Sequence, residues 1–222
     1  MLLFHGCGGV RGHMEDYGRA AAAAGVRAFV VDSYTPRGWG FGFGVAFVCT
    51  GMRFWGRERA GDVLAALWGM SQRPDVDAGR ICLAGWSHGA WSIMDLMTMP
   101  LTRTGEAALR DPDPAPLSGV RSLFLAYPYG GFGALSRKRS WVRSPAVLGV
   151  IPASDHITRR SDVELIYGPV RRCGAKLEIW ELEEGTHSFD EPAPHFPMSR
   201  HPEMALEAQR RFTAYLQRTL EP

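Results

Sequence analysis

The chain alternates short apolar runs with longer segments of helical periodicity, and this alternation limits its possible folds more than any other feature of the sequence. Runs of this kind, rich in β-branched and aromatic residues, are typical of parallel strands buried on both faces. Strands that alternate with helices are joined by right-handed crossovers, which place helices on both faces of one sheet. We therefore expect an α/β fold with a doubly wound, mainly parallel sheet of about six strands. The runs expected to form strands are residues 2–5, 26–33, 80–86, 122–129, 145–153 and 175–182.

The helical segments fill most of the intervals between these runs. Their apolar residues recur at spacings of three and four, as on one face of an α-helix. With 222 residues, of which 45% are hydrophobic, the chain suits a single domain over residues 1–222. The expected helices are residues 15–25, 56–72, the segment after Ser87, 158–172 and 202–220. The stretches that interrupt the alternation are residues 35–56, 101–119 and 130–144.

Charge and cysteine spacing argue against several kinds of partner. The net charge of +2 is far from the dense basic composition that neutralises many phosphates, so we expect no nucleic-acid partner. No apolar run approaches the roughly 18 residues of a membrane span, so we expect no membrane partner. The four cysteines are scattered without a C-x-x-C pair, and one lies in an expected buried strand. This pattern favours reduced cysteines and a cytoplasmic location.

The most informative motif is Gly85-Trp86-Ser87-His88-Gly89, which fits the pattern G-x-S-x-G between an expected strand and an expected helix. In that context the motif predicts a sharp, strained turn that presents the Ser87 hydroxyl above the sheet at a helix N-terminus. Small residues on both sides let the neighbouring chain approach closely. The alternative is an ordinary strand-to-helix turn in which Ser87 only caps the helix.

A serine hydroxyl is a weak nucleophile at neutral pH and needs a base, which a third group must orient. His187 follows the last expected strand and Asp155 follows the preceding one, so both lie at the same edge of the sheet as Ser87. The order Ser87, Asp155, His187 matches the order of nucleophile, acid and base in α/β-hydrolases. His156 as the base and Asp162 as the acid remain alternatives.

Acyl transfer also needs donors for the oxyanion that develops on the substrate. The segment "FHGCGGV" after the first expected strand resembles the His-Gly loop that supplies one of these donors. This resemblance implies that the Cys7 N–H lies opposite the N–H of His88, at the start of the helix that follows Ser87. The same loop, residues 6–12, fits the dinucleotide pattern G-x-G-x-x-G only with a shift of one position. We expect the His88 imidazole to be structural. A metal site has no support in the spacing of the later histidines, which are His187, His195 and His201.

Five segments occur together in the order "HGCGG", "VDSYTPRG", "RPDVDAGRICLAGWSHG", "PASDHIT" and "GTHSFD". In this combination the chain resembles the dienelactone hydrolase family of α/β-hydrolases over nearly its whole length. Two features differ from that family. Its members commonly carry cysteine where this chain has Ser87, and they usually begin with additional strands before the His-Gly loop. The resemblance therefore implies an N-terminally shortened α/β-hydrolase fold, whose exposed sheet edge is a place for homodimer pairing.

The expected function is that of a serine hydrolase that cleaves small carboxylic esters or lactones through an acyl-enzyme, without a metal or organic cofactor. Ser87 is the expected nucleophile, His187 the base and Asp155 the orienting acid, with the oxyanion held by the N–H groups of Cys7 and His88. Residues 101–119 are too short and too charged for a large apolar lid, which favours small substrates. Two other functions stay open: a thioesterase or acyltransferase with the same residues, and a non-catalytic binding module.

Overall fold

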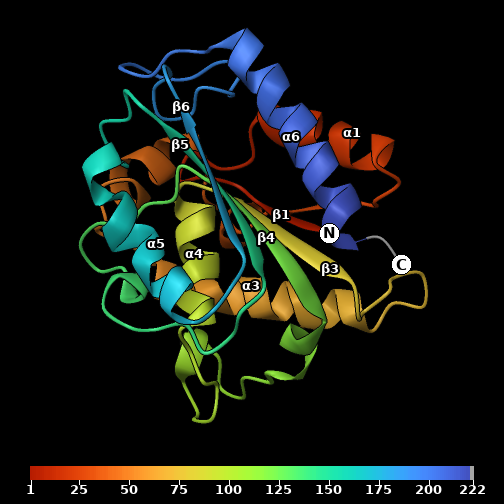
Figure 1. Ribbon diagram of the computed structural model, residues 1–222. Helices are drawn as coiled ribbons and strands as arrows, with labels where there is room; N and C mark the ends of the chain where they lie inside the picture. Colours follow the sequence, from red (N-terminus) through yellow and green to blue (C-terminus); the bar gives the residue numbers. More distant parts are fainter. Residues whose placement is uncertain (221–222) are drawn as a thin grey trace.

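The computed structural model describes residues 1–220 and contains one six-stranded parallel sheet with the order β2-β1-β3-β4-β5-β6 (Figure 1). Each strand falls on one of the apolar runs, so the expected doubly wound α/β fold is confirmed. β2 forms one edge of the sheet, and pairing of two copies at that edge stays a prediction. The strands are β1 (Leu2–Phe4), β2 (Phe29–Val31), β3 (Ile81–Trp86), β4 (Val120–Ala126), β5 (Ala146–Pro152) and β6 (Leu177–Leu182).

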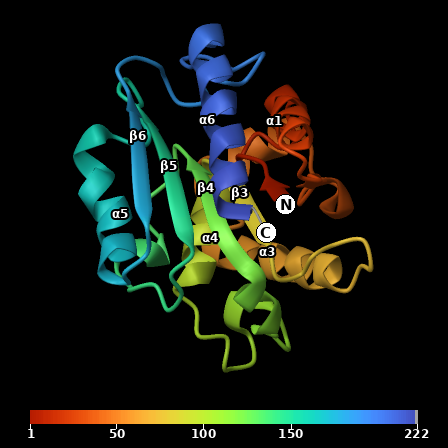
Figure 2. The same cartoon turned by 45° about the vertical axis from the view of Figure 1, so that its right-hand side comes forward.

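Helices cover both faces of this sheet. α1 and α6 lie on one face, and α3, α4 and α5 lie on the other (Figures 1 and 2). No helix within residues 1–220 is both long and apolar enough to span a bilayer. The helices of ten or more residues are α1 (Gly12–Ala23), α3 (Gly56–Ser71), α4 (His88–Met97), α5 (Val163–Arg172) and α6 (Pro202–Leu220).

Successive strand residues point to opposite faces and so build two cores. In β1, Leu2 and Phe4 join the core under α3, α4 and α5, whereas Leu3 joins the core under α1 and α6. In β3, Leu83 and Cys82 divide in the same way. Both faces of the central strands are therefore apolar, which explains why the strand runs read as continuous rather than alternating.

Strand register brings distant loops together at the carboxyl edge of the sheet. Phe4 at the end of β1 pairs with Gly85 near the end of β3, so the loop after β1 lies beside the turn after β3. Pro152 at the end of β5 pairs with Leu182 at the end of β6, so the loops that follow these strands also start side by side.

The stretch expected to be irregular between β2 and α3 contains short helical turns and a disulfide. Its turns are η1 (Thr35–Arg37), α2 (Phe41–Phe43) and the π-turn η2 (Gly44–Val48). A disulfide joins Cys7 to Cys49, whereas Cys82 and Cys173 are free. The expectation of four reduced cysteines is therefore wrong, because the fold brings together two cysteines that are 42 positions apart in the sequence.

Candidate active site

Ser87 occupies a strained turn between β3 and α4. Its backbone angles are φ 50° and ψ −110°, which residues other than glycine rarely adopt. The flanking glycines permit the turn, because a Cβ on Gly85 would overlap the Ala90 amide and one on Gly89 would overlap the Phe4 carbonyl. The Ser87 side chain makes no capping hydrogen bond to α4. The alternative of a plain helix cap therefore does not describe this serine.

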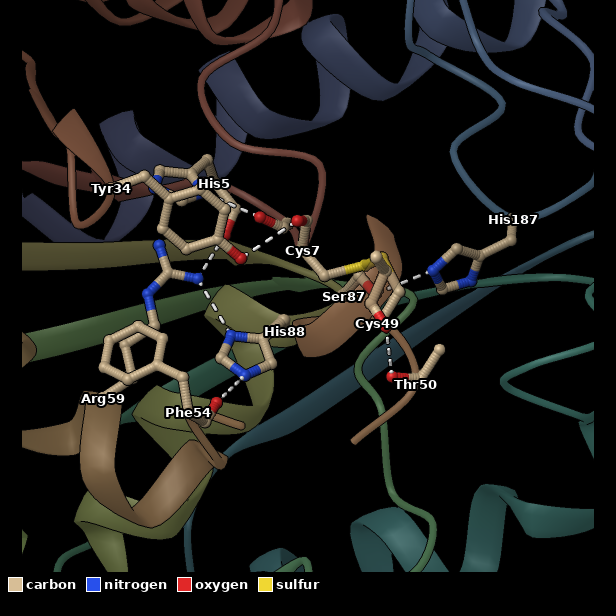
Figure 3. The surroundings of a disulfide bond; sticks show 12 residues. His5, Cys7, Tyr34, Cys49, Thr50, Phe54, Arg59, Ser87, His88 and His187 are labelled. Atoms are coloured by element: carbon tan, nitrogen blue, oxygen red, sulfur yellow. Dashed lines mark hydrogen bonds between the residues drawn. A yellow bond between two sulfur atoms is a disulfide. The ribbon is translucent and has the colours of Figure 1, made fainter. Parts of the chain in front are cut away.

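The Ser87 hydroxyl belongs instead to a chain of hydrogen bonds that joins three buried residues. Ser87 Oγ lies 2.8 Å from His187 Nε2, and His187 Nδ1 lies 2.7 Å from Asp155 Oδ2. Because a carboxylate only accepts, Nδ1 donates to Asp155, which leaves Nε2 free to accept the serine proton. Figure 3 shows the His187 ring facing Ser87. The three residues proposed from the sequence thus lie in hydrogen-bonding contact.

Backbone donors hold the Asp155 carboxylate in place. Its Oδ1 accepts hydrogen bonds from the amides of Ile157, at 2.7 Å, and Thr158, at 2.8 Å. The other oxygen is thereby aimed at His187. The two alternative residues take no part in this chain of hydrogen bonds, although His156 lines the cavity beside it. His156 is exposed, with its ring centre 6.4 Å from that of His187, and Asp162 lies in η6 (Arg160–Asp162), ahead of α5.

The loop that carries His187 is anchored by Asp190, a residue that the sequence analysis missed. Asp190 is buried and accepts hydrogen bonds from the Tyr127 hydroxyl at 2.6 Å and from Trp86 Nε1 at 3.1 Å. Burial, and then the charge of Asp190, raise the pKa of Tyr127 well above its ordinary value, so the phenol stays protonated and donates. The Tyr127 ring also packs edge-on against His187. Asp190 lies inside the segment "GTHSFD", but nothing in its spacing marked it as buried.

The loop after β1, residues 5–9, lies against the serine turn. A Cβ on Gly6 would lie 3.6 Å from the Ser87 Cβ. Within residues 1–220 the Cys7 N–H has no hydrogen-bond acceptor, and the His88 N–H belongs to the first turn of α4, where amides lack helical partners. These are the two donors expected from the sequence. Tyr34, which lies between β2 and η1, donates its hydroxyl to the Cys7 carbonyl at 2.9 Å and so holds this loop.

Arg59 of α3 links this loop to the His88 side chain (Figure 3). The fully buried guanidinium donates to the His5 carbonyl at 2.6 Å and lies 3.1 Å from His88 Nδ1, while His88 Nε2 lies 2.7 Å from the Phe54 carbonyl. The carbonyl requires a proton on Nε2, so Nδ1 accepts from Arg59. Burial, and then the charge of Arg59, lower the pKa of His88 to about 3. The imidazole is therefore neutral and structural, as expected.

Arg59 itself was missed, although a sequence signal for it exists. It shares a helix face with Val63 and Leu67, which are four and eight positions later, and a charged residue on such a face is unusual. Burial lowers the pKa of Arg59 to about 10, which still leaves the guanidinium charged at neutral pH. The charged guanidinium donates hydrogen bonds to the carbonyl and side-chain acceptors around it.

A cavity of ≈ 680 Å³ opens beside Ser87. Aromatic side chains form much of its wall, and polar groups lie among them, including the ion pair of Arg11 and Glu191 at 2.6 Å. Of the aromatic residues of the stretch between β2 and α3, Phe41 and Trp55 line the cavity, whereas Phe54 packs in a separate cluster with Tyr34 and Val48. The other aromatic residues that line the cavity are Trp86, Trp91, Tyr127, Tyr129 and Phe132.

Comparisons with known proteins agree with this architecture. A scan against protein-family models and a search of curated proteins found no match. Among solved structures, a putative dienelactone hydrolase from Klebsiella pneumoniae matches with a TM-score of 0.67 at 18% identity, over 97% of this chain and 85% of that one. A putative hydrolase of the alpha/beta superfamily from Xanthomonas campestris matches with a TM-score of 0.61 at 18% identity, over 98% of this chain and 97% of the other. The chain has the α/β-hydrolase fold.

A third match is an esterase of the same fold. Thermogutta terrifontis esterase 2, in a structure described as phosphorylated by paraoxon, has a TM-score of 0.68 at 16% identity, over 100% of this chain and 83% of that chain. The resemblance to dienelactone hydrolases expected from the sequence is thus confirmed at the level of the α/β-hydrolase fold.

Proposed function

We propose that the protein is a serine hydrolase that cleaves small carboxylic esters or lactones through an acyl-enzyme. The observation that carries the proposal is the hydrogen-bonded line from Ser87 through His187 to Asp155, at a strained turn that opens onto a cavity. The likeness in fold to structures described as esterases and dienelactone hydrolases supports the same class of reaction.

In the proposed mechanism Ser87 Oγ attacks the carbonyl carbon of the substrate while His187 Nε2 takes the hydroxyl proton. Asp155 keeps the imidazole in the required tautomer and stabilises its charged form. The negative charge that develops on the carbonyl oxygen is held by the N–H groups of Cys7 and His88. His187 then returns the proton to the leaving alcohol. In the second half of the reaction a water molecule attacks the acyl-enzyme while His187 takes its proton, and Ser87 leaves as the hydroxyl when His187 gives that proton back.

The cavity walls favour an apolar or aromatic acyl or alcohol group of modest size. No residue of the segment 101–119 lines the cavity, in keeping with the proposal that no large lid covers it. Hydrolysis by this route needs no metal or organic cofactor. The cytoplasmic location stays a prediction, and its premise of four reduced cysteines is not met.

Paraoxon tests the proposal, because only a serine activated by a base is phosphorylated rapidly by such a compound. Intact mass spectrometry should find one diethylphosphoryl group on the wild-type protein and none on Ser87→Ala, and only the wild type should hydrolyse p-nitrophenyl acetate. A wild-type protein that stays unlabelled, or a Ser87→Ala protein that is labelled equally, would contradict the proposal. Transfer of the acyl group to an added thiol or alcohol in preference to water would instead identify a transferase.

A further inference from the structure

The Cys7–Cys49 disulfide joins the loop proposed to bind the oxyanion to a segment of the cavity wall. Cys7 carries one of the two proposed donors, and Cys49 directly follows η2 and lines the same cavity together with Val48. Figure 3 shows the sulfur–sulfur bond beside Ser87, on the side away from Arg59. A crosslink at this place acts on the position of a backbone N–H that a substrate would contact.

The segment 41–49, which we name the wall segment, is mostly exposed, and its noncovalent anchors are aromatic and apolar contacts: Phe41 with Arg11 and His195, Phe43 with Trp39, and Val48 in the cluster of Tyr34 and Phe54. Of its residues only Gly44 and Val48 are buried. Glycines at positions 42 and 44 within it, and at 38, 40 and 51 beside it, leave the backbone here many accessible conformations. Few buried side chains and a glycine-rich backbone are the features of a segment that opens locally at low free-energy cost.

The wall segment nevertheless packs directly on the loop after β1, residues 5–9, which carries the proposed donor of Cys7. The Phe41 ring lies 3.5 Å from the position a Cβ would take on Gly8, and a Cβ on Gly44 would overlap the Cys7 carbonyl oxygen. Backbone therefore touches backbone at Gly44. These contacts fix the Cys7 peptide only while the wall segment stays in place, and the disulfide is the covalent bond that keeps it there.

We propose that the Cys7–Cys49 disulfide is a positioning element of the oxyanion site, so that the protein reaches full turnover only while this disulfide is formed. The inference rests on the proposed function. A donor to the oxyanion is effective because it is already oriented when charge develops, and a loosened loop must first be ordered in the transition state. Loss of the disulfide should therefore lower kcat more than it raises KM.

The bond is open to chemical reduction, because Cys49 is exposed and Cys7 is half-buried. A dithiol such as dithiothreitol attacks one sulfur as its thiolate and forms a mixed disulfide. Its second thiol then closes the ring of the oxidised reagent. Two electrons and two protons pass to the protein, which leaves thiols on Cys7 and Cys49. Oxidised glutathione reverses the exchange, so the loss of turnover should be reversible.

The first experiment compares the oxidised and the dithiothreitol-treated wild-type protein. Alkylation by iodoacetamide in denaturant, followed by intact mass, should count two free cysteines before and four after reduction. On p-nitrophenyl acetate the reduced protein should show a kcat lower by about tenfold to a hundredfold, with KM changed by less than about threefold. Circular dichroism at the assay temperature verifies that the reduced protein is folded.

A pair of inhibitors separates positioning from a general structural role. An alkyl trifluoromethyl ketone accepts Ser87 Oγ at its carbonyl and becomes an oxyanion, with the serine proton on His187, whereas the methyl ketone of the same chain only occupies the cavity. Reduction should weaken binding of the trifluoromethyl ketone by about tenfold or more and that of the methyl ketone by less than about threefold. Equal weakening of both would contradict a positioning role.

Variants give a matched control. Cys49→Ser keeps the Cys7 backbone and should behave like the reduced wild type, and dithiothreitol should not lower its kcat further. Cys173→Ser changes a free cysteine that follows α5, donates to the Val170 carbonyl, packs at the edge of the core and does not line the cavity, so it should keep wild-type kinetics and sensitivity to reduction.

The outcomes also distinguish this inference from the function beneath it. A reduced wild-type protein, with four alkylated cysteines, whose kcat stays within about twofold of the oxidised value would overturn the inference alone. Isolation with four free thiols that resist oxidation would do the same. An oxidised protein that neither hydrolyses esters nor binds the trifluoromethyl ketone would overturn the proposed function and this inference with it.

Discussion

At the scale of single residues, three of the seven non-glycine residues with positive φ within residues 1–220 belong to the turn, strand end and loop that surround the proposed nucleophile. Ser87, Tyr127 and Ser188 all have positive φ, and they belong respectively to the serine turn, the end of β4 and the His187 loop. Conformations of this kind persist only where surrounding contacts over-determine them. Here the contacts are the packing of α4 on β1 and the buried Asp190 network. These strained backbone angles bring the side chains of Ser87, Tyr127 and Ser188 to one place, which regular strand or helix geometry would not do.

Alanine substitutions test the roles within the proposed triad. Ser87→Ala and His187→Ala should each lower kcat by about 10⁴ to 10⁶, and the double variant should be hardly worse, because triad members act as a unit. Asp155→Asn should cost somewhat less. Steady-state kinetics on p-nitrophenyl acetate measure these effects. The exposed His156 serves as the control, since His156→Ala should stay within about tenfold of wild type; a folded but inactive His156→Ala would mean that the base is misassigned.

Asp95 should make stability depend on pH. Its carboxyl is buried in α4, accepts from Trp91 Nε1 and the Ser136 amide, and burial raises its pKa to about 7. A folded pKa above the unfolded value of about 3.9 contributes stability that is fully present below pH ~4 and is lost as the pH rises through ~7. Urea unfolding should therefore give a free energy lower at pH 8 than at pH 5 by an Asp95 contribution on the order of 2 kcal/mol.

The Asp95→Asn variant isolates that contribution. Its difference in unfolding free energy between pH 5 and pH 8 should be smaller than that of the wild type by about the same amount, because other titrating groups are common to both proteins. An identical pH dependence in the two proteins would show that Asp95 titrates normally in the fold.

At the scale of elements, close contact between two backbones determines how α3 packs. α3 packs against the turn η3 (Glu106–Ala108) of the segment between α4 and β4. A Cβ on Gly61 of α3 would overlap the Ala107 carbonyl oxygen, so this glycine lets the two backbones touch. Gly69, two turns later in the same helix, has no atom within 4 Å of its Cβ position. The two glycines therefore differ only in their tertiary surroundings.

That difference gives opposite expectations for one substitution in one helix. Gly69→Ala should raise the free energy of unfolding by about 0.5–1 kcal/mol, because alanine restricts the unfolded chain and favours the helix. Gly61→Ala should lower it by about 1–3 kcal/mol, because the added methyl group forces the backbones apart. Chemical denaturation measures both. A stabilising Gly61→Ala would mean that the segment 101–119 is not held against α3.

At the scale of the whole molecule, the parallel sheet delivers every loop of the proposed site to one edge. The loops after β1, β3, β5 and β6 supply Cys7, Ser87, Asp155 and His187, although the residues span most of the chain. The segment between α4 and β4, which is a candidate for a lid, packs on α3 instead and takes no part in lining the cavity. Access to Ser87 is therefore not controlled by that segment.

We accordingly expect no activation at a lipid interface. The rate on tributyrin should rise smoothly with concentration and show no jump where the substrate forms an emulsion. Rates on soluble p-nitrophenyl acetate, measured with the same preparation, provide the reference. A rate on emulsified triglyceride well above that on the soluble ester would show that an apolar cover opens at an interface.

Local pattern determined a large part of this protein. Short apolar runs and helical periodicity are properties of neighbouring residues, and they gave the order and approximate bounds of the strands and main helices. The sharp turn at Ser87 could be recognised from the sequence because its glycines and Ser87 lie within five consecutive positions. The sheet edge of the site could be predicted because parallel strands bring the loops that follow them to one edge. His187 and Asp155 were proposed by that topological argument.

Only the tertiary structure decided which distant groups meet. The disulfide of Cys7 and Cys49, the burial of Arg59 against His88, and the anchoring of the His187 loop by Asp190 all join segments far apart in the chain. No local periodicity encodes such contacts, because they depend on register between strands and on how loops pack after the sheet forms. For the same reason the sequence could name candidates for the donors and the nucleophile, but could not find the residues that hold these candidates in position.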